Sequence, residues 1–200
     1  VMLRVSGGSY IDEATGTSMV MPSGDLLTAV MPAIVAGATI NNVQVTPVTA
    51  MAQAMADRMA GGMSEANIAA ANAAMGNYFS VADILHTHPM NPRVVGAAAG
   101  ADHDARNYGI TLAAMCQYAK ALNMANSSAM VTAMMNDAAD GVMDGKAGAS
   151  QVSMHMGGMM GEHAMGPTAG TTDLSAAMAA FMNSPANKSG MTAADMAALI

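Results

Sequence analysis

TPVTAMAQAMADRMAGG, residues 46–62, is the stretch that decides the fold class. Thr46 is a good helix N-cap, Pro47 suits the first helical position, and the double glycine at the end favours a helix stop. Methionine recurs every four residues, at Met51, Met55 and Met59. This spacing predicts a buried helix face on which methionine takes the place that leucine usually has.

Similar patterns continue toward the C-terminus. Ser64 is a second N-cap, in front of EANIAAANAAMGNYF, and Pro89 and Pro92 must interrupt the segment VADILHTHPMNP. Apolar-periodic segments follow at 104–124, 127–141, 172–184 and 192–200. We therefore expect a mostly α protein with five to seven helices in residues 46–200.

Residues 1–45 have a different character. Short apolar runs alternate with glycines, and TINNVQV, residues 39–45, alternates β-branched and polar residues. These features predict short strands and turns, that is, a small N-terminal β element in front of the helical domain.

The composition limits the classes of function. Charged residues make up 10% of the chain, aromatic residues 3% and hydrophobic residues 52%, and the formal net charge is −7. Without a basic stripe or aromatic stacking surface, nucleic-acid binding is not expected. No apolar run is long enough to predict a membrane span. Cys116 is the only cysteine, which excludes an intrachain disulfide or a cluster of thiolate ligands.

MHMGGMMGEHAMG, residues 154–166, is the densest group of potential metal ligands. Its glycines disfavour a helix, so we expect a Gly/Met/His-rich loop at about 145–170. Thioether sulfur is a soft ligand that suits Cu(I), and imidazole suits copper in both oxidation states. The candidate copper ligands are Met154, His155, Met156, Met159, Met160, His163 and Met165. Chance clustering in a chain with 25 methionines is the alternative interpretation.

HTHP, residues 86–89, is a second candidate. His86 and His88 point the same way if the backbone is extended, and they could then chelate a metal ion with Met90 or His103. Solvated loop histidines are the alternative.

Other polar clusters have simpler interpretations. DAADGVMDG, residues 137–145, lacks the spacing of a calcium-binding loop and is typical of a helix end with solvated acids. No catalytic motif such as G-x-S-x-G, a P-loop or HExxH occurs, so we expect a protein that is not an enzyme.

Five motifs in order resemble a helical module of bacterial surface proteins and lipoproteins. They are SGGSYIDEATG, VTPVT, ANIAAANAAM, YGITLAAMCQYA and DAADGVMDG. The resemblance covers about residues 5–145. It implies an extracytoplasmic location and a non-catalytic role. The chain departs from such modules in its many methionines and its paired histidines.

Two functions follow as hypotheses. The first is an extracytoplasmic, non-catalytic Met/His-rich domain that binds copper, preferably Cu(I), for sequestration or handover. The second is a structural cell-surface or filament-forming module without a metal role. In the second case the strand around VMLRVSG, residues 1–7, would pair with another copy or with a surface-protein partner.

Overall fold

The N-terminal β element consists of two small antiparallel pairs in the computed structural model, which describes residues 1–196. Strand β1 (Met2–Ser6) pairs with β4 (Leu26–Val30). Between them in sequence, β2 (Ser9–Ile11) pairs with β3 (Ser18–Val20). The expected N-terminal β element is therefore present.

The described chain contains five α-helices, in agreement with the predicted number of five to seven. They are α1 (Pro47–Arg58), α2 (Glu65–Tyr78), α3 (His103–Ala121), α4 (Ser127–Asp137) and α5 (Leu174–Met182). Short 3-10 turns lie at Ala97–Gly100, Ala138–Asp140, Gly158–Met160 and Ala193–Met196, and a π turn lies at Ala169–Asp173. Of the segment predicted as a last helix, residues 197–200 lie outside the described residues.

The helix starts follow local capping chemistry. The Thr46 side chain accepts the Thr49 backbone N–H while the Thr49 hydroxyl accepts the Thr46 N–H, a reciprocal capping box. Ser64 caps α2 by accepting the Asn67 N–H. Both predicted N-caps are confirmed.

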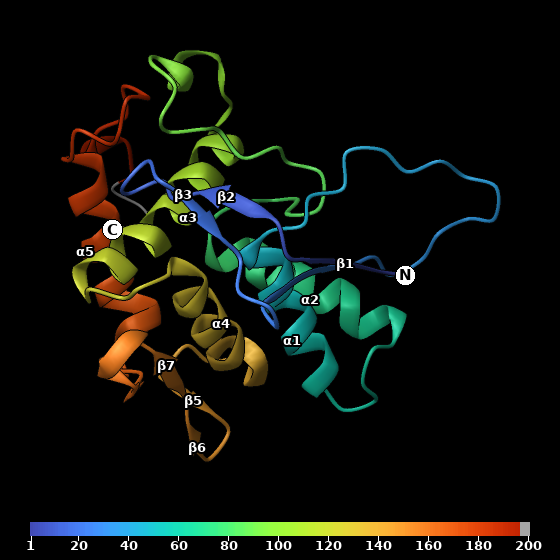
Figure 1. The fold of residues 1–200 in the computed structure, drawn as a ribbon. Coiled ribbons are helices and arrows are strands. Elements are labelled where there is room, and N and C mark those ends of the chain that lie inside the picture. Colours follow the sequence, from blue (N-terminus) through green and yellow to red (C-terminus); the bar gives the residue numbers. More distant parts are fainter. Residues whose placement is uncertain (197–200) are drawn as a thin grey trace.

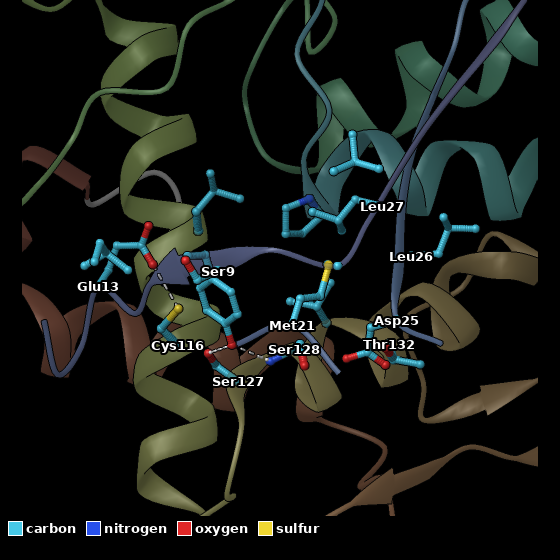
Figure 2. A pocket seen from close by; sticks show the side chains of 17 residues that line it. Ser9, Glu13, Met21, Asp25, Leu26, Leu27, Cys116, Ser127, Ser128 and Thr132 are labelled. Atoms are coloured by element: carbon cyan, nitrogen blue, oxygen red, sulfur yellow. Dashed lines mark hydrogen bonds between the residues drawn. The ribbon is translucent and has the colours of Figure 1, made fainter. Parts of the chain in front are cut away.

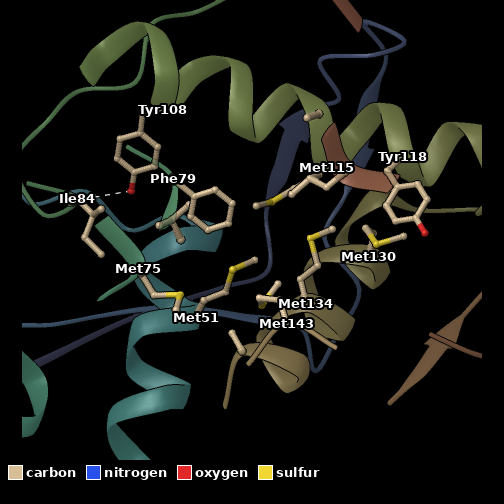
Figure 3. Close-up of a cluster of buried hydrophobic side chains, with 14 of the residues drawn as sticks. Met51, Met75, Phe79, Ile84, Tyr108, Met115, Tyr118, Met130, Met134 and Met143 are labelled. Atoms are coloured by element: carbon tan, nitrogen blue, oxygen red, sulfur yellow. Dashed lines mark hydrogen bonds between the residues drawn. The ribbon is translucent and has the colours of Figure 1, made fainter. Parts of the chain in front are cut away.

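Methionine fills much of the core. Figure 3 shows Met51, Met115, Met130 and Met134 converging from α1, α3 and α4, and none of the four is exposed. Met55 and Met59 are only partly buried, at the margin of the same cluster. The methionine face predicted for α1 therefore faces the core, and its burial decreases toward the C-terminal end of the helix.

Helix α3 lies centrally and contacts both α4 and α5, while α1 contacts α2, α4 and β4 (Figure 1). The backbone of Met90 crosses α3 at Gly109. A Cβ atom at Gly109 would collide with the Met90 carbonyl oxygen, so only glycine permits this crossing. The segment 84–92 is thereby held against the helix without being helical itself.

Two expectations about strands are wrong. Residues 39–45 form no strand, although the Gln44 backbone N–H donates to the Leu85 carbonyl. Conversely, the segment expected to be a loop contains two short hairpins. Strand β5 (Lys146–Ala147) pairs with β6 (Ser150–Gln151), and β7 (Ser153–His155) pairs with β8 (Glu162–Ala164). The described residues are therefore a mixture of helices and short sheets.

The acids after α4 are not all solvated, contrary to expectation. Asp137 is fully buried, and one of its carboxylate oxygens accepts the backbone N–H groups of Asp144, Gly145 and Lys146. These hydrogen bonds hold the turn that connects α4 to β5. Asp140 is exposed as expected, although its carboxylate also accepts the backbone N–H groups of Val142 and Gly148.

Among the helices of residues 1–196, none combines the length and apolar character that crossing a membrane requires.

Candidate metal-binding site

The Met/His-rich segment is a β-hairpin whose two faces differ in burial. Val152, Met154 and Met156 are buried, whereas Ser153 and His155 between them are exposed. This period-two alternation is what a strand produces when one face lies on a core. The hairpin is closed by a hydrogen bond from the Met156 N–H to the Gly161 carbonyl oxygen.

Three of the seven candidate ligands in this segment belong to the core. Met154, Met156 and Met165 are only 5%, 4% and 1% exposed, and all three pack in the main hydrophobic cluster. Strand β7 lies against α4, which covers this face. In this conformation the three thioethers act as packing groups under the hairpin.

The other four candidates are exposed. They are His155, Met159, Met160 and His163. Met159 is fully exposed and Met160 is 49% exposed, so neither side chain contributes much to packing. Both lie in the turn at the tip, between Gly157 and Gly161, whose positive φ angles give the turn a shape that other residues rarely adopt.

Glu162 is a residue of the candidate site that the sequence pattern did not reveal. In the hairpin register it faces His155, and its Oε1 lies 2.7 Å from His155 Nδ1. A carboxylate only accepts hydrogen bonds, so Nδ1 carries the proton of this bond and the other ring nitrogen, Nε2, is left as the candidate metal ligand. Carboxylates orient metal-binding histidines in this way, by accepting the N–H of the nitrogen that does not bind the metal. The alternation of residues 152–156 is the only sequence signal for this strand, and it is too short to identify Glu162 as the cross-strand partner.

His163 does not join His155. The register pairs His163 with Met154, so its side chain lies on the opposite face of the hairpin from that of His155. The hairpin therefore brings His155 and Glu162 together and separates the two histidines.

The HTHP segment lies elsewhere, between α2 and α3. His86 Nδ1 lies 2.8 Å from Asp83 Oδ2, and His88 Nδ1 lies 3.0 Å from the Pro89 carbonyl oxygen. Both acceptors again leave Nε2 available. The two histidines line one open hollow of about 750 Å³. A turn hydrogen bond from the Thr87 N–H to the Asp83 carbonyl shows that His86 is not in the extended backbone that the HTHP interpretation required.

The two additional ligands suggested for this pair are placed differently. Met90 is 6% exposed and packs in the core, although it also borders the hollow. His103 opens α3 and hydrogen-bonds to Asp104 and Asn107. Within residues 1–196, no three His, Cys, Asp or Glu side chains are grouped in a way that could hold a metal ion. Methionine is not one of these four residue types, and the hairpin tip offers mainly methionine.

Among known proteins, no family model, curated protein or solved structure matches this chain.

Proposed function

We propose that this protein is a non-catalytic, extracytoplasmic copper-binding domain whose ion binds at the outer side of the β7–β8 hairpin. The ligands would be His155 Nε2 and the thioether sulfurs of Met159 and Met160. The observation that carries the proposal is the His155–Glu162 hydrogen bond, because it orients an imidazole on the exposed face of a hairpin whose tip carries two exposed methionines. His163 lies on the other face, and we assign it no ligand role.

The donor set favours Cu(I). Thioether sulfurs are soft, and one imidazole with one or two thioethers suits the low coordination numbers of this ion. A methionine ligand needs no deprotonation and forms no disulfide, which suits an oxidising compartment outside the cytoplasm. Gly157, Gly158 and Gly161 allow the turn to adjust, and methionine side chains have three rotatable bonds. An exposed site of this kind favours handover to a partner over deep sequestration.

Anaerobic titration with Cu(I) against a chromogenic chelator tests the proposal. The parent protein should withdraw Cu(I) at micromolar copper. The variant with His155→Ala, Met159→Leu and Met160→Leu should lose most of this uptake, because all three donors are removed from one exposed turn.

Two control variants make the result specific. His163→Ala removes the imidazole of the other face, and Met154→Leu with Met156→Leu replaces thioethers under the hairpin; both should retain Cu(I) uptake. The proposal fails if the parent does not compete with the chelator, or if the triple variant binds as the parent does. Loss of uptake in the Met154/Met156 variant instead would move the site to the core face.

A second candidate function is supported by the free edge of β1. Val1 and Met31 exchange backbone hydrogen bonds, and the pairing register then directs the N–H and C=O groups of Met2, Arg4 and Ser6 away from β4. Within residues 1–196, no strand pairs with this edge. Val1, Leu3 and Val5 are 58%, 37% and 45% exposed. We propose as the alternative a structural module in which β1 of a second copy adds to this edge.

Sedimentation velocity of the parent and of Arg4→Pro tests this alternative. Proline removes an outward-pointing N–H and does not remove a β1–β4 hydrogen bond, so the fold should persist while assembly is lost. A parent that stays monomeric at high concentration, or an Arg4→Pro variant that still assembles, contradicts the module hypothesis.

A further inference from the structure

A pocket of about 250 Å³ lies between the N-terminal strands and helices α1, α3 and α4. Its wall is mainly aliphatic. The N-terminal strands and the helices both contribute to it, and the lining residues include Val5, Ile11, Leu26, Leu27, Leu112 and Val131. Figure 2 shows the side chains that enclose it. This volume accommodates a small molecule, and an apolar wall with a few polar groups is typical of ligand sites.

The polar groups of the wall are acidic or neutral. Glu13 and Asp25 line the pocket together with Tyr10, Cys116 and several hydroxyl side chains, and no Lys, Arg or His is among the lining residues. The Cys116 thiol donates to Glu13 Oε2 at 3.0 Å. Burial raises the pKa of the Cys116 thiol, so the thiol remains a neutral donor to Glu13. Arg93, which donates to the Glu13 backbone carbonyl from outside the pocket lining, is the cation that acts on this carboxyl group.

Two lining groups are buried without a hydrogen-bond partner in the described part of the chain. One is Oδ2 of Asp25, and the other is Oγ of Ser128, a residue that is only 7% exposed. Buried polar groups are rarely left unpaired, because each one costs free energy that a partner would offset. The wall therefore offers hydrogen-bond acceptors that a donor inside the pocket could satisfy.

Glu13 and Asp25 lie at opposite ends of the pocket. In Figure 2 the Glu13 carboxyl is beside Cys116 on α3, whereas Asp25 lies beyond Met21, near Thr132 on α4. Met21 and Leu27 lie between these two ends, and Leu26 lies beyond Asp25 (Figure 2). A ligand that complements this arrangement is apolar in the middle and carries a positive charge at each end.

From this geometry we propose that the pocket binds a linear aliphatic diamine, with one ammonium group at Glu13 and the other at Asp25. The methylene chain packs against the aliphatic wall, and each ammonium donates charge-assisted hydrogen bonds to a carboxylate. The Ser128 hydroxyl and the unpaired Asp25 oxygen are available as further acceptors. Carboxylate ligands such as short fatty acids are disfavoured, because the wall presents acids and no cation. This inference is independent of copper binding at the hairpin.

Calorimetric titration of the full chain with 1,6-diaminohexane, n-hexylamine and hexanoate tests the charge pattern. The diamine should bind about tenfold more tightly than the monoamine, because the second charged hydrogen bond adds about one decade of affinity. Hexanoate should give no binding. Equal affinities for the three probes, or no heat from the diamine, overturns the proposal.

Single substitutions at the two ends then test the placement. Glu13→Gln and Asp25→Asn should each reduce diamine affinity to that of hexylamine and leave hexylamine bound at the other end. Asp57→Asn removes the same charge from an exposed position on α1 and is the matched control, which should bind like the parent. Diamine affinity that is unchanged in both end variants overturns the proposal. If one end variant does not fold, the other still decides the matter.

A series from 1,4-diaminobutane to 1,8-diaminooctane adds a second criterion. A wall of fixed length should give an affinity maximum at one chain length. A flat dependence on length would indicate non-specific ion pairing with surface acids and would also overturn the proposal.

Discussion

One carboxylate oxygen of Asp137 accepts the backbone N–H of Gly145 at 2.6 Å, across a turn of eight residues. The same oxygen accepts two neighbouring N–H groups, and Asp137 is fully buried. A single side chain therefore accepts hydrogen bonds from three consecutive backbone N–H groups of the loop that follows α4. The connection from α4 to the hairpins depends on this carboxylate.

Asp137→Ala should consequently destabilise the protein by about 3 kcal/mol, because the buried N–H of Gly145 and the N–H of Asp144 would lose their acceptor and a buried side chain would be truncated. Urea unfolding followed by circular dichroism measures the change. Asp57→Ala is the comparison, since Asp57 is exposed on α1 and its substitution should cost much less. Equal effects in the two variants would contradict the role assigned to Asp137.

Gly109→Ala should cost about 1–3 kcal/mol, because the added methyl group meets the Met90 carbonyl oxygen, a backbone atom that cannot rotate away. Gly100 offers a control. A methyl group added there would meet no atom within 4 Å, and its φ is not positive, so Gly100→Ala should be nearly neutral. Urea unfolding of both variants provides the measurement. A neutral Gly109→Ala variant would show that the segment around Met90 can move off α3.

The two groups of methionines in the hairpin should respond differently to truncation. Met154→Ala removes a buried side chain and should cost about 2–5 kcal/mol. Met159→Ala changes a fully exposed side chain and should stay within about 0.5 kcal/mol of the parent. Thermal melts of both variants without metal provide the measurement. Similar losses of stability at both positions would mean that the Met159 side chain is packed against other residues and is not exposed.

Stability should depend on pH through Glu13. Burial raises the pKa of its carboxyl above the ordinary value of 4.5, so the folded state holds this proton more tightly than the unfolded state. The protonated Glu13 carboxyl therefore adds to the free energy of unfolding. This contribution is fully present below about pH 4.5 and is lost as the pH rises through the pKa of Glu13 in the folded state. Burial also raises the pKa of Asp137, so its contribution to stability likewise falls as the pH rises.

Glu13→Gln should therefore flatten part of the fall in stability between acidic and neutral pH. Urea unfolding of parent and variant across this range checks the slope. Because Asp137 remains in the variant, some pH dependence should persist. A variant whose profile runs parallel to that of the parent would show that Glu13 does not titrate with a raised pKa.

The sequence predicted those elements whose signals are local. Thr46 and Ser64 mark helix starts because a capping side chain bonds to backbone groups within three residues. TINNVQV failed as a strand because alternation alone provides no partner strand. The hairpin was not predicted because its glycines argue only against a helix, and the alternation of residues 152–156 is too short to be a strong strand signal.

The candidate site was only partly predictable for a related reason. The residue types in 154–165 indicated metal ligands, but which of them face the core depends on strand register and on α4, far back in the chain. The same register places Glu162 opposite His155. The pocket could not be predicted at all, since its wall joins residues 5–27 to residues 112–132.

The contacts of the N-terminal strands also bear on the order of folding. Tyr10 hydrogen-bonds to Asn126 and Ser127, and Glu13 to Cys116, so the separations in sequence exceed one hundred residues. Loop-closure entropy makes such contacts slow to form, whereas the helices gain most of theirs locally. Strands β1 and β4 can dock once α1 has been made, since β4 packs against α1, whereas Tyr10 and Glu13 have no partners until α3 and the start of α4 have been made. The β2–β3 segment is thus completed only after helices that lie far behind it in the sequence, and until then its apolar side chains are exposed to aggregation.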